Sequence, residues 1–198
     1  MIFNAEMVRA ILDGRKTQTR RIMKVQPGTP EFGLRRIIES SKANENGMYF
    51  WSQDDACGIK ARSKPFLFPY GEVGDRIWVR ETFCAVPDHE EPAGCSALLY
   101  AADGNGPYGK WTPSIHMPRW ASRLTLEITG VRVERLRDLS EDDAKSEGIT
   151  PPSGGVLPGW EYRINFRDLW MDIYGTDNWE ANPWVWVIEF KRVEGGAA

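Results

Sequence analysis

Hydrophobic and polar positions along the chain follow two periods, and each period predicts a different kind of element. Apolar residues recur at helical spacing over 4–13, with Asn4 suited to cap the helix and Gly14 suited to end it. A second helical pattern covers 162–174. Its apolar side consists of Ile164, Phe166, Leu169, Trp170 and Ile173. We therefore predict an amphipathic helix at each of these two positions.

A shorter helix and a set of strands complete the pattern. Ser140 precedes an acidic first turn, close to a capping box, and Gly148 ends the predicted helix. The long alternating run 123–136 predicts a strand with a bulge at Gly130, and the apolar run 184–190 predicts another. Further strands are predicted over 15–22, 76–83 and 96–101.

The remaining segments are rich in glycine and proline and are read as insertions near 24–70, 102–121 and 150–160. We expect little regular structure in the first of them. With 198 residues, the chain suits one domain spanning 1–198. Strands joined by long loops, with helices at the margins, predict an α+β fold built on a small curled sheet or barrel.

Composition narrows the class of protein. Hydrophobic residues make up 41% and charged residues 27%, which is typical of a globular protein rather than a disordered one. The net charge of -3 excludes a generally basic nucleic-acid coat but permits a local basic patch. Because the chain lacks a long apolar run and a signal-peptide pattern, we expect a cytoplasmic protein without a membrane partner.

Cysteine and histidine give no sign of a metal centre. The three cysteines lack a C-x-x-C pair, and an odd count does not suit a disulfide framework. His89 and His116 lie in predicted loops without ligand spacing. We therefore expect neither a metal nor a cofactor.

One short segment, 14–21, concentrates four cations and two hydroxyl groups. A solvated basic strand and a polar binding site both agree with this composition. Strand alternation would place Thr17, Thr19 and Arg21 on one face, and a bend at the preceding glycine would bring Lys16 beside Thr19. A hydroxyl, an amine and a guanidinium would then converge on one small polar ligand.

The same segment has the components of acid–base chemistry. Crowded arginines and partial burial would both lower the pKa of Lys16. A lysine with a lowered pKa acts as a general base, and a hydroxyl beside it becomes a nucleophile. Glu147 lies in the last turn of its helix, where the macrodipole disfavours a carboxylate by about 0.3 kcal/mol. On that feature alone, Glu147 is more typical of a surface carboxylate than of a site residue.

The pattern Gly14-x-Lys16-Thr17-x-Thr19-x-Arg21 resembles the signature of the ASCH-domain family in the PUA-like superfamily. Later segments follow in the same order over roughly half of the chain: 73–79, 126–133, 140–148 and 187–190. The resemblance implies a PUA-like small β-barrel with flanking helices. It also implies a cleft for RNA, nucleotides or modified nucleosides.

The enzymes that this pattern resembles most are small N4-acetylcytidine amidohydrolases, which are considerably shorter than this chain. The resemblance implies that Lys16, Thr19 and Glu147 are catalytic residues of a metal-independent amidohydrolase. A glutamate would raise the pKa of a neighbouring lysine, so whether Lys16 or Glu147 is the general base stays open. Our candidates for binding the substrate are Arg21, Arg20 and Thr17.

Other functions agree with the same residues. The chain could be a non-catalytic reader of RNA or modified bases, a ribonuclease, or a structural or regulatory phage protein, since larger relatives resemble phage-encoded proteins. The expected partner is a modified nucleoside or RNA, with DNA as an alternative, and the oligomeric state is not predicted.

The aromatic residues also have two interpretations. We assign Trp78, Trp184 and Trp186 to the core, because alternation in a strand favours packing. The run 49–51 is aromatic and precedes three cations at 60–64, so it would either stack bases or anchor the insertion.

Overall fold

The computed structural model describes residues 1–86, 98–104, 110–150 and 161–193. The fold is of the α+β class, as predicted, with mostly antiparallel sheets and a few helices. The chain divides into two compact units, one formed by Met1–Arg21 with Val73–Ala198 and the other by Ile22–Glu72. His89, Cys95 and most of the predicted insertion at 150–160 lie outside the described residues.

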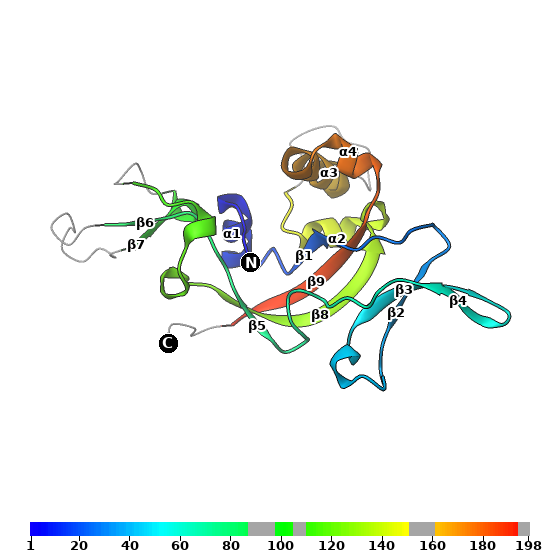
Figure 1. Cartoon of the computed structure of the whole chain (residues 1–198). Coiled ribbons are helices and arrows are strands. Elements are labelled where there is room, and N and C mark those ends of the chain that lie inside the picture. The colour runs from blue at the N-terminus through cyan, green and yellow to red at the C-terminus, as the bar shows by residue number, and fades with distance from the viewer. Residues whose placement is uncertain (87–97, 105–109, 151–160, 194–198) are drawn as a thin grey trace. The chain divides into compact units, whose positions relative to one another are not determined.

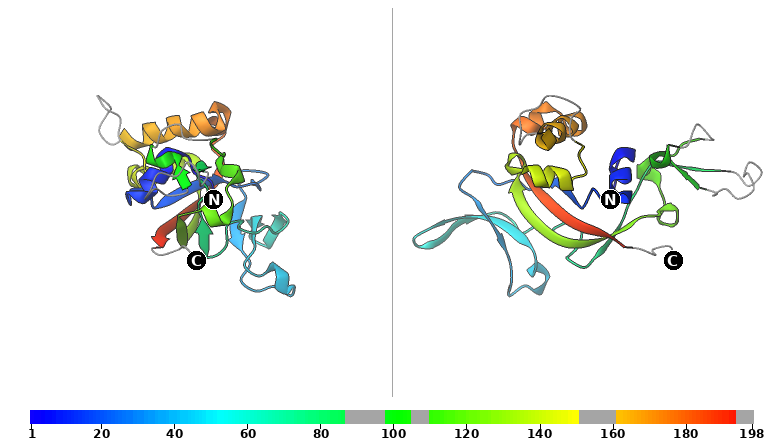
Figure 2. Two further views of the ribbon diagram at one scale, coloured as in Figure 1. Left: turned by 90° about the vertical axis from the view of Figure 1, so that its left-hand side faces the viewer. Right: turned by 180° about the vertical axis from the view of Figure 1, so that it is seen from behind.

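The first unit is built on a four-stranded sheet with the order β1-β9-β8-β5. Its strands are β1 Gln18–Ile22, β5 Arg76–Trp78, β8 Thr125–Arg135 and β9 Trp184–Val193. The two long strands β8 and β9 run antiparallel side by side (Figures 1 and 2). Their register shifts between Ile128 and Gly130, which confirms the predicted bulge. Among the described residues, β1 and β5 are the two edges of this sheet, so a closed barrel is not confirmed.

Two predicted strands are shorter than expected. The run 76–83 divides into β5 and β6 Phe83–Ala85, and β6 pairs antiparallel with β7 Leu98–Tyr100. Between β5 and β6 the chain stays hydrogen-bonded, but to other partners, since Val79 N donates to Leu124 O. The predicted loop at 102–121 contains short 3-10 helices, η3 Ala101–Asp103, η4 Ser114–His116 and η5 Arg119–Ala121.

The helices of this unit are α1 Ala5–Leu12, α2 Glu141–Ser146, α3 Glu161–Tyr174 and α4 Thr176–Glu180. The Asn4 side chain caps α1 by accepting a hydrogen bond from Met7 N. Ser140 and Asp143 form a complete capping box at the start of α2. Helix α4 was not predicted. Helices α2, α3 and α4 gather at the same end of the β8–β9 pair (Figures 1 and 2).

Strand β9 supplies much of the core of the first unit, because its residues Val185 to Ile188 are all buried. A strand buried on both faces is the pattern of a central strand covered on each side. The assignment of Trp186 to the core is confirmed, and Trp184 is half-buried. Trp78, which is also assigned to the core, is half-buried as well, and its ring lies near the guanidinium groups of Arg80 and Arg119.

The second unit contains an antiparallel sheet with the order β2-β3-β4. Its elements are β2 Gly33–Arg36, η1 Ala43–Glu45, β3 Tyr49–Asp55 and β4 Gly58–Arg62. Trp51 of the central strand is fully buried, and its indole nitrogen donates to Val25 O at 2.9 Å. The expectation of little regular structure here is therefore wrong, and Trp51 is an anchor of this unit. The description of 1–198 as one domain stays a prediction.

None of the described helices has the length and apolar character needed to cross a membrane.

Candidate functional site

The turn between α1 and β1 places the backbone of Lys16 against the end of α2. Gly14 adopts a φ of +74°, a conformation that glycine tolerates best, and Lys16 N donates to Ala10 O. Lys16 and Glu147 then pair as an isolated antiparallel bridge. Gly148 permits this approach, because a Cβ added there would lie 2.8 Å from the Lys16 Cβ. The predicted bend at Gly14 is confirmed.

The side chains of this turn form a buried cluster of charges. Lys16 Nζ donates to Glu147 Oε2 and to the Glu147 backbone oxygen, each at 2.8 Å. Arg20 Nη1 donates to the other carboxylate oxygen, Oε1, at 3.2 Å. Lys16 and Glu147 are each only 4% exposed. Both oxygens of the glutamate are thus held by cations in a site that water barely reaches.

Arg20 connects this pair to a wider network of carboxylates. Its Nη2 lies 3.0 Å from Glu134 Oε2 and 3.4 Å from Asp143 Oδ2. Burial disfavours the ionised form of Asp143, but hydrogen bonds from Ser140 and Gln18 and the charge of Arg20 outweigh it and lower its pKa to about 2. Arg20 is therefore neutralised by three carboxylates and acts as a positioning residue for Glu147.

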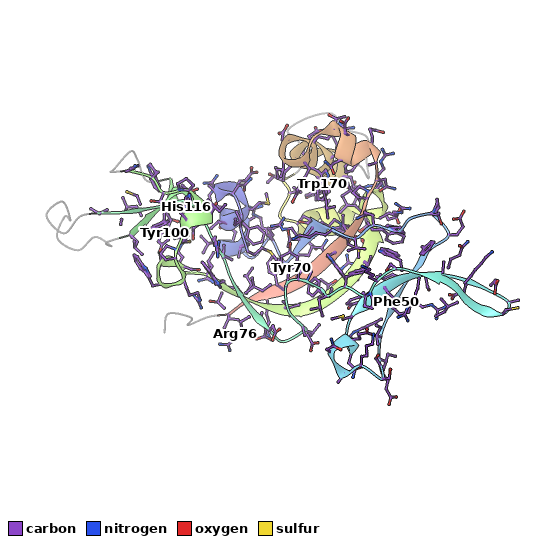
Figure 3. The ribbon with its side chains drawn as sticks, in the orientation of Figure 1. Phe50, Tyr70, Arg76, Tyr100, His116 and Trp170 are labelled. Carbon is purple, nitrogen blue, oxygen red and sulfur yellow. The ribbon has the colours of Figure 1, made fainter. Side chains whose placement is uncertain are left out.

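A small cavity with room for about 50 Å³ of solvent lies against this cluster. Its polar part contains Lys16, Thr19, Arg20, Arg21 and Glu147, and its aromatic part contains Phe3, Phe166, Trp170 and Tyr174. Trp170 lies on α3 (Figure 3), with its ring 4.5 Å from that of Tyr174. An aromatic wall beside a few convergent polar groups suits a planar ligand with a polar edge.

Two residues that line the cavity each carry a buried donor without a hydrogen-bond partner among the described residues, Arg20 Nε and Trp170 Nε1. A buried donor without a partner is rare in folded proteins and costs free energy.

The pKa of Lys16 is lowered from its ordinary value. Burial is the largest cause, and the charges of Arg21 and Arg20 act in the same direction. The charge and hydrogen bond of Glu147 oppose them. The predicted direction is therefore confirmed. The lowered pKa means that Lys16 loses its proton more readily than an exposed lysine does.

The other candidates take different positions. Thr19 is buried and lines the cavity, but no hydrogen bond joins its hydroxyl to Lys16 in the described structure. Arg21 also lines the cavity, and its Nη2 donates to Ile2 O at 2.9 Å. No described carboxylate pairs with Arg21. Thr17 is exposed and does not line this cavity, so the structure does not bring it to the other candidates.

The aromatic wall was missed as part of a site, although its spacing was visible. Phe166, Trp170 and Tyr174 lie four residues apart on α3, so they share one face of the helix. The sequence analysis identified only an apolar side of this helix, and such a pattern does not reveal whether it faces packed side chains or a cavity. Ile173, which was assigned to the same stripe, is mostly exposed.

Comparison with known proteins gives no match to a family model, to a curated protein or to a solved structure. Within the described ranges, no group of three or more histidine, cysteine, aspartate or glutamate residues could hold a metal ion. The family resemblance, and the function that it implies, therefore stay proposals.

Proposed function

We propose that this chain is an ASCH-type, PUA-like protein that recognises a nucleoside or nucleic-acid base and hydrolyses an N-acyl group, such as that of N4-acetylcytidine. The observation that carries the proposal is the Lys16–Glu147 pair, which joins residues 131 positions apart and borders a cavity beside Thr19. The PUA-like barrel is part of this proposal. The curled sheet with helices at one end agrees with it.

A purely structural role does not explain the choice of residues. Arginine is the usual cation of buried ion pairs, because its guanidinium stays charged and matches a carboxylate in two places. Lysine loses its proton more readily when buried, and lysines in such positions serve as general bases. Lys16 is buried, has a lowered pKa and borders open volume. These features together favour a catalytic amine.

The reaction follows from the atoms at the cavity. Lys16 Nζ accepts the proton of the Thr19 hydroxyl while Oγ1 attacks the acyl carbonyl and forms a tetrahedral intermediate. The intermediate collapses when the C–N bond breaks, and Lys16 returns the proton to the leaving amine. A water molecule then attacks the acyl–threonine ester while its proton goes to Lys16. The second tetrahedral intermediate collapses when the C–Oγ1 bond breaks, Lys16 returns the proton to Oγ1, and the carboxylic acid leaves.

Several neighbouring groups support these steps. Glu147 orients Lys16 through the hydrogen bond at 2.8 Å and stabilises its protonated form. The Arg21 guanidinium, which no described carboxylate neutralises, would stabilise the oxyanion of the tetrahedral intermediate. The rings of α3 would stack on the base, and the unpartnered nitrogen atoms of Arg20 and Trp170 would donate to its acceptor atoms.

The test is turnover of N4-acetylcytidine, followed by mass spectrometry of cytidine and acetate. Lys16→Arg keeps a cation but removes a group that can lose its proton, so we expect turnover to fall by at least 10²-fold. Thr19→Val should abolish turnover, because it replaces the hydroxyl with a methyl group, and Thr19→Ser should restore part of it. An exposed lysine of α2 provides the matched control, and Lys145→Arg should leave turnover unchanged.

Retained turnover in Lys16→Arg would show that the lysine serves only as a cation. Binding of N4-acetylcytidine by the wild-type protein without any turnover would favour the non-catalytic reader instead. Cleavage of RNA that depends on Lys16 would favour the ribonuclease.

A further inference from the structure

A second group of aromatic and basic side chains lies on the surface of the first unit, around Trp78 of β5. The guanidinium carbon of Arg80 lies 4.4 Å from the centre of the Trp78 ring, and that of Arg119 lies 5.9 Å from it. Arg76 is two residues before Trp78 on the same strand (Figure 3), so it shares the same face. We call Arg76, Trp78, Arg80 and Arg119, together with Trp120, which follows Arg119 in η5, the arginine–tryptophan patch.

The patch faces solvent because the strand alternates. Val79 and Glu81 are both buried on one side of this segment, whereas Arg76 is exposed, and Trp78 and Arg80 are half-buried. Trp120 of η5 is 71% exposed. Tryptophan is among the residues that contribute most to interfaces, and an indole this exposed is unusual for a side chain without a partner.

The arginines of the patch have no acidic partner among the described residues. Arg80 Nη1 donates to a backbone oxygen, that of Ile115, at 3.3 Å. Glu127 lies opposite Arg76 in the sheet register, but its carboxylate is held by Lys191 at 2.8 Å. The patch is thus locally positive on a chain whose net charge is -3.

We propose that the arginine–tryptophan patch binds single-stranded nucleic acid. Unpaired guanidinium groups attract phosphates, and exposed indole rings stack on bases whatever their sequence. Arg80 and Arg119 beside Trp78 hold one indole in place, while Trp120 presents another to solvent. The proposal goes beyond the hydrolysis of an N-acyl group and does not require it.

The patch also borders the cavity through a short stretch of backbone. Ile2 forms a parallel bridge with Arg80, and Phe3 N donates to Arg80 O at 3.2 Å. Phe3 lines the cavity, and Ile2 O accepts the hydrogen bond from Arg21. If the proposed function is correct, the two sites would act on one substrate, an acylated base within a polynucleotide.

The test is the fluorescence anisotropy of a labelled 12-nucleotide single-stranded RNA, with DNA of the same sequence in a second arm, at low and moderate salt. The wild-type protein should bind both, and its affinity should fall as salt rises. The double variant Arg76→Gln/Arg119→Gln should bind at least tenfold more weakly, with a salt slope reduced by about 1.4, because two phosphate contacts are lost. Trp120→Ala should weaken binding by about fivefold or more with little change in slope.

The matched control is Lys145→Gln/Arg167→Gln, which removes two exposed cations that each pair with a carboxylate. It should bind like the wild type. Equal weakening by the patch variant and the control would overturn the proposal, as would the absence of binding at low salt or an unaffected Trp120→Ala variant. Lys16→Arg separates the two proposals, because it should keep oligonucleotide binding whether or not the chain hydrolyses an N-acyl group.

Discussion

The first unit contains two buried carboxylates that pair with cations, Glu147 and Glu81. They differ in the type of cation that pairs with them. Around Glu147 the cations are Lys16 and Arg20. Around Glu81 the cation is Arg123, which holds that carboxylate with two hydrogen bonds at 2.9 and 3.0 Å. Arg123 also holds both oxygens of Asp103, each at 2.8 Å.

The pKa values of Arg123 and Lys16 are shifted in opposite directions. Burial opposes the charge of Arg123, but the hydrogen bonds and charges of Glu81 and Asp103 outweigh it and raise its pKa. Burial lowers the pKa of Lys16, and the single opposing carboxylate does not reverse it. Arg123 therefore stays charged and forms a purely structural ion pair, whereas Lys16 can exchange a proton at a cavity. A buried ion pair indicates chemistry when one member can change its charge and borders open volume.

The cluster around Arg123 connects two parts of the first unit. Arg123 lies 4.0 Å from the centre of the Tyr100 ring, and the Tyr100 hydroxyl donates to Ala121 O at 2.9 Å. Tyr100 ends β7, which pairs with β6 in the small two-stranded sheet. The cluster thus joins this sheet to the segment that precedes β8.

The largest effect on stability should come from removing Arg123. Arg123→Ala would leave the buried Glu81 without its cation, and breaking such a pair costs about 3–5 kcal/mol in the free energy of unfolding. Urea denaturation of the wild type and the variant measures this loss. The double variant Glu81→Leu/Arg123→Met is the control, because it replaces both charges with apolar groups and should regain much of the stability. If Arg123→Ala is as stable as the wild type, the ion pair of Arg123 with Glu81 does not stabilise the fold.

The sequence predicted local features of the fold better than its long-range pairings. The caps at Asn4 and Ser140 and the bulge near Gly130 depend on neighbouring residues, and all three are confirmed. The sheet of the second unit was missed, because β2 is largely glycine and arginine and shows no apolar alternation. Its pairing with β3 depends on residues that lie beyond the reach of a local pattern.

The same distinction applies to the site. The bend at Gly14 and the lowered pKa of Lys16 were predicted from nearby residues. The position of Glu147 was implied by the family resemblance alone, because its local context indicated a surface carboxylate. From the sequence, Asp143 is only a member of the acidic first turn of its helix. In the structure its carboxylate also accepts a hydrogen bond from Gln18 and pairs with Arg20. Alternation divides the side chains of a strand between two faces but does not show which face is covered. The pattern around Trp78 therefore could not establish how deeply this side chain is buried.

Replacing Asp143 should have a smaller effect on the free energy of unfolding, and this effect should depend on pH in the acidic range. Its folded-state pKa of about 2 lies below its ordinary value of 3.8, so the carboxylate contributes stability above the ordinary value and loses it as the pH falls through the folded value. After allowance for solvent screening, this contribution is about 1–2 kcal/mol. Urea denaturation of the wild type and Asp143→Asn should therefore show a difference at pH 5 that shrinks near pH 2.

The neighbouring carboxylate provides the control, because the Asp142 side chain is 91% exposed. Asp142→Asn should follow the wild-type pH dependence. A pH dependence of Asp143→Asn that matches the wild type would show that the network around Arg20 does not bind this carboxylate in its ionised form.

A further effect on stability should come from Lys16, on the alkaline side. Its folded-state pKa is lowered, so between that value and 10.5 the unfolded chain binds more protons than the folded one, and stability rises with pH. The free energy of unfolding of the wild type minus that of Lys16→Met should therefore increase across this range, by at most about 1.4 kcal/mol per pH unit. Lys145→Met, which removes an exposed amine with a raised pKa, should not show this increase. Because Arg123 stays charged throughout, the Arg123→Ala difference should be flat over the same range. A Lys16→Met difference that is flat or decreases would mean that Lys16 is as permanently charged as Arg123, and the contrast between the two clusters would then disappear together with the general base.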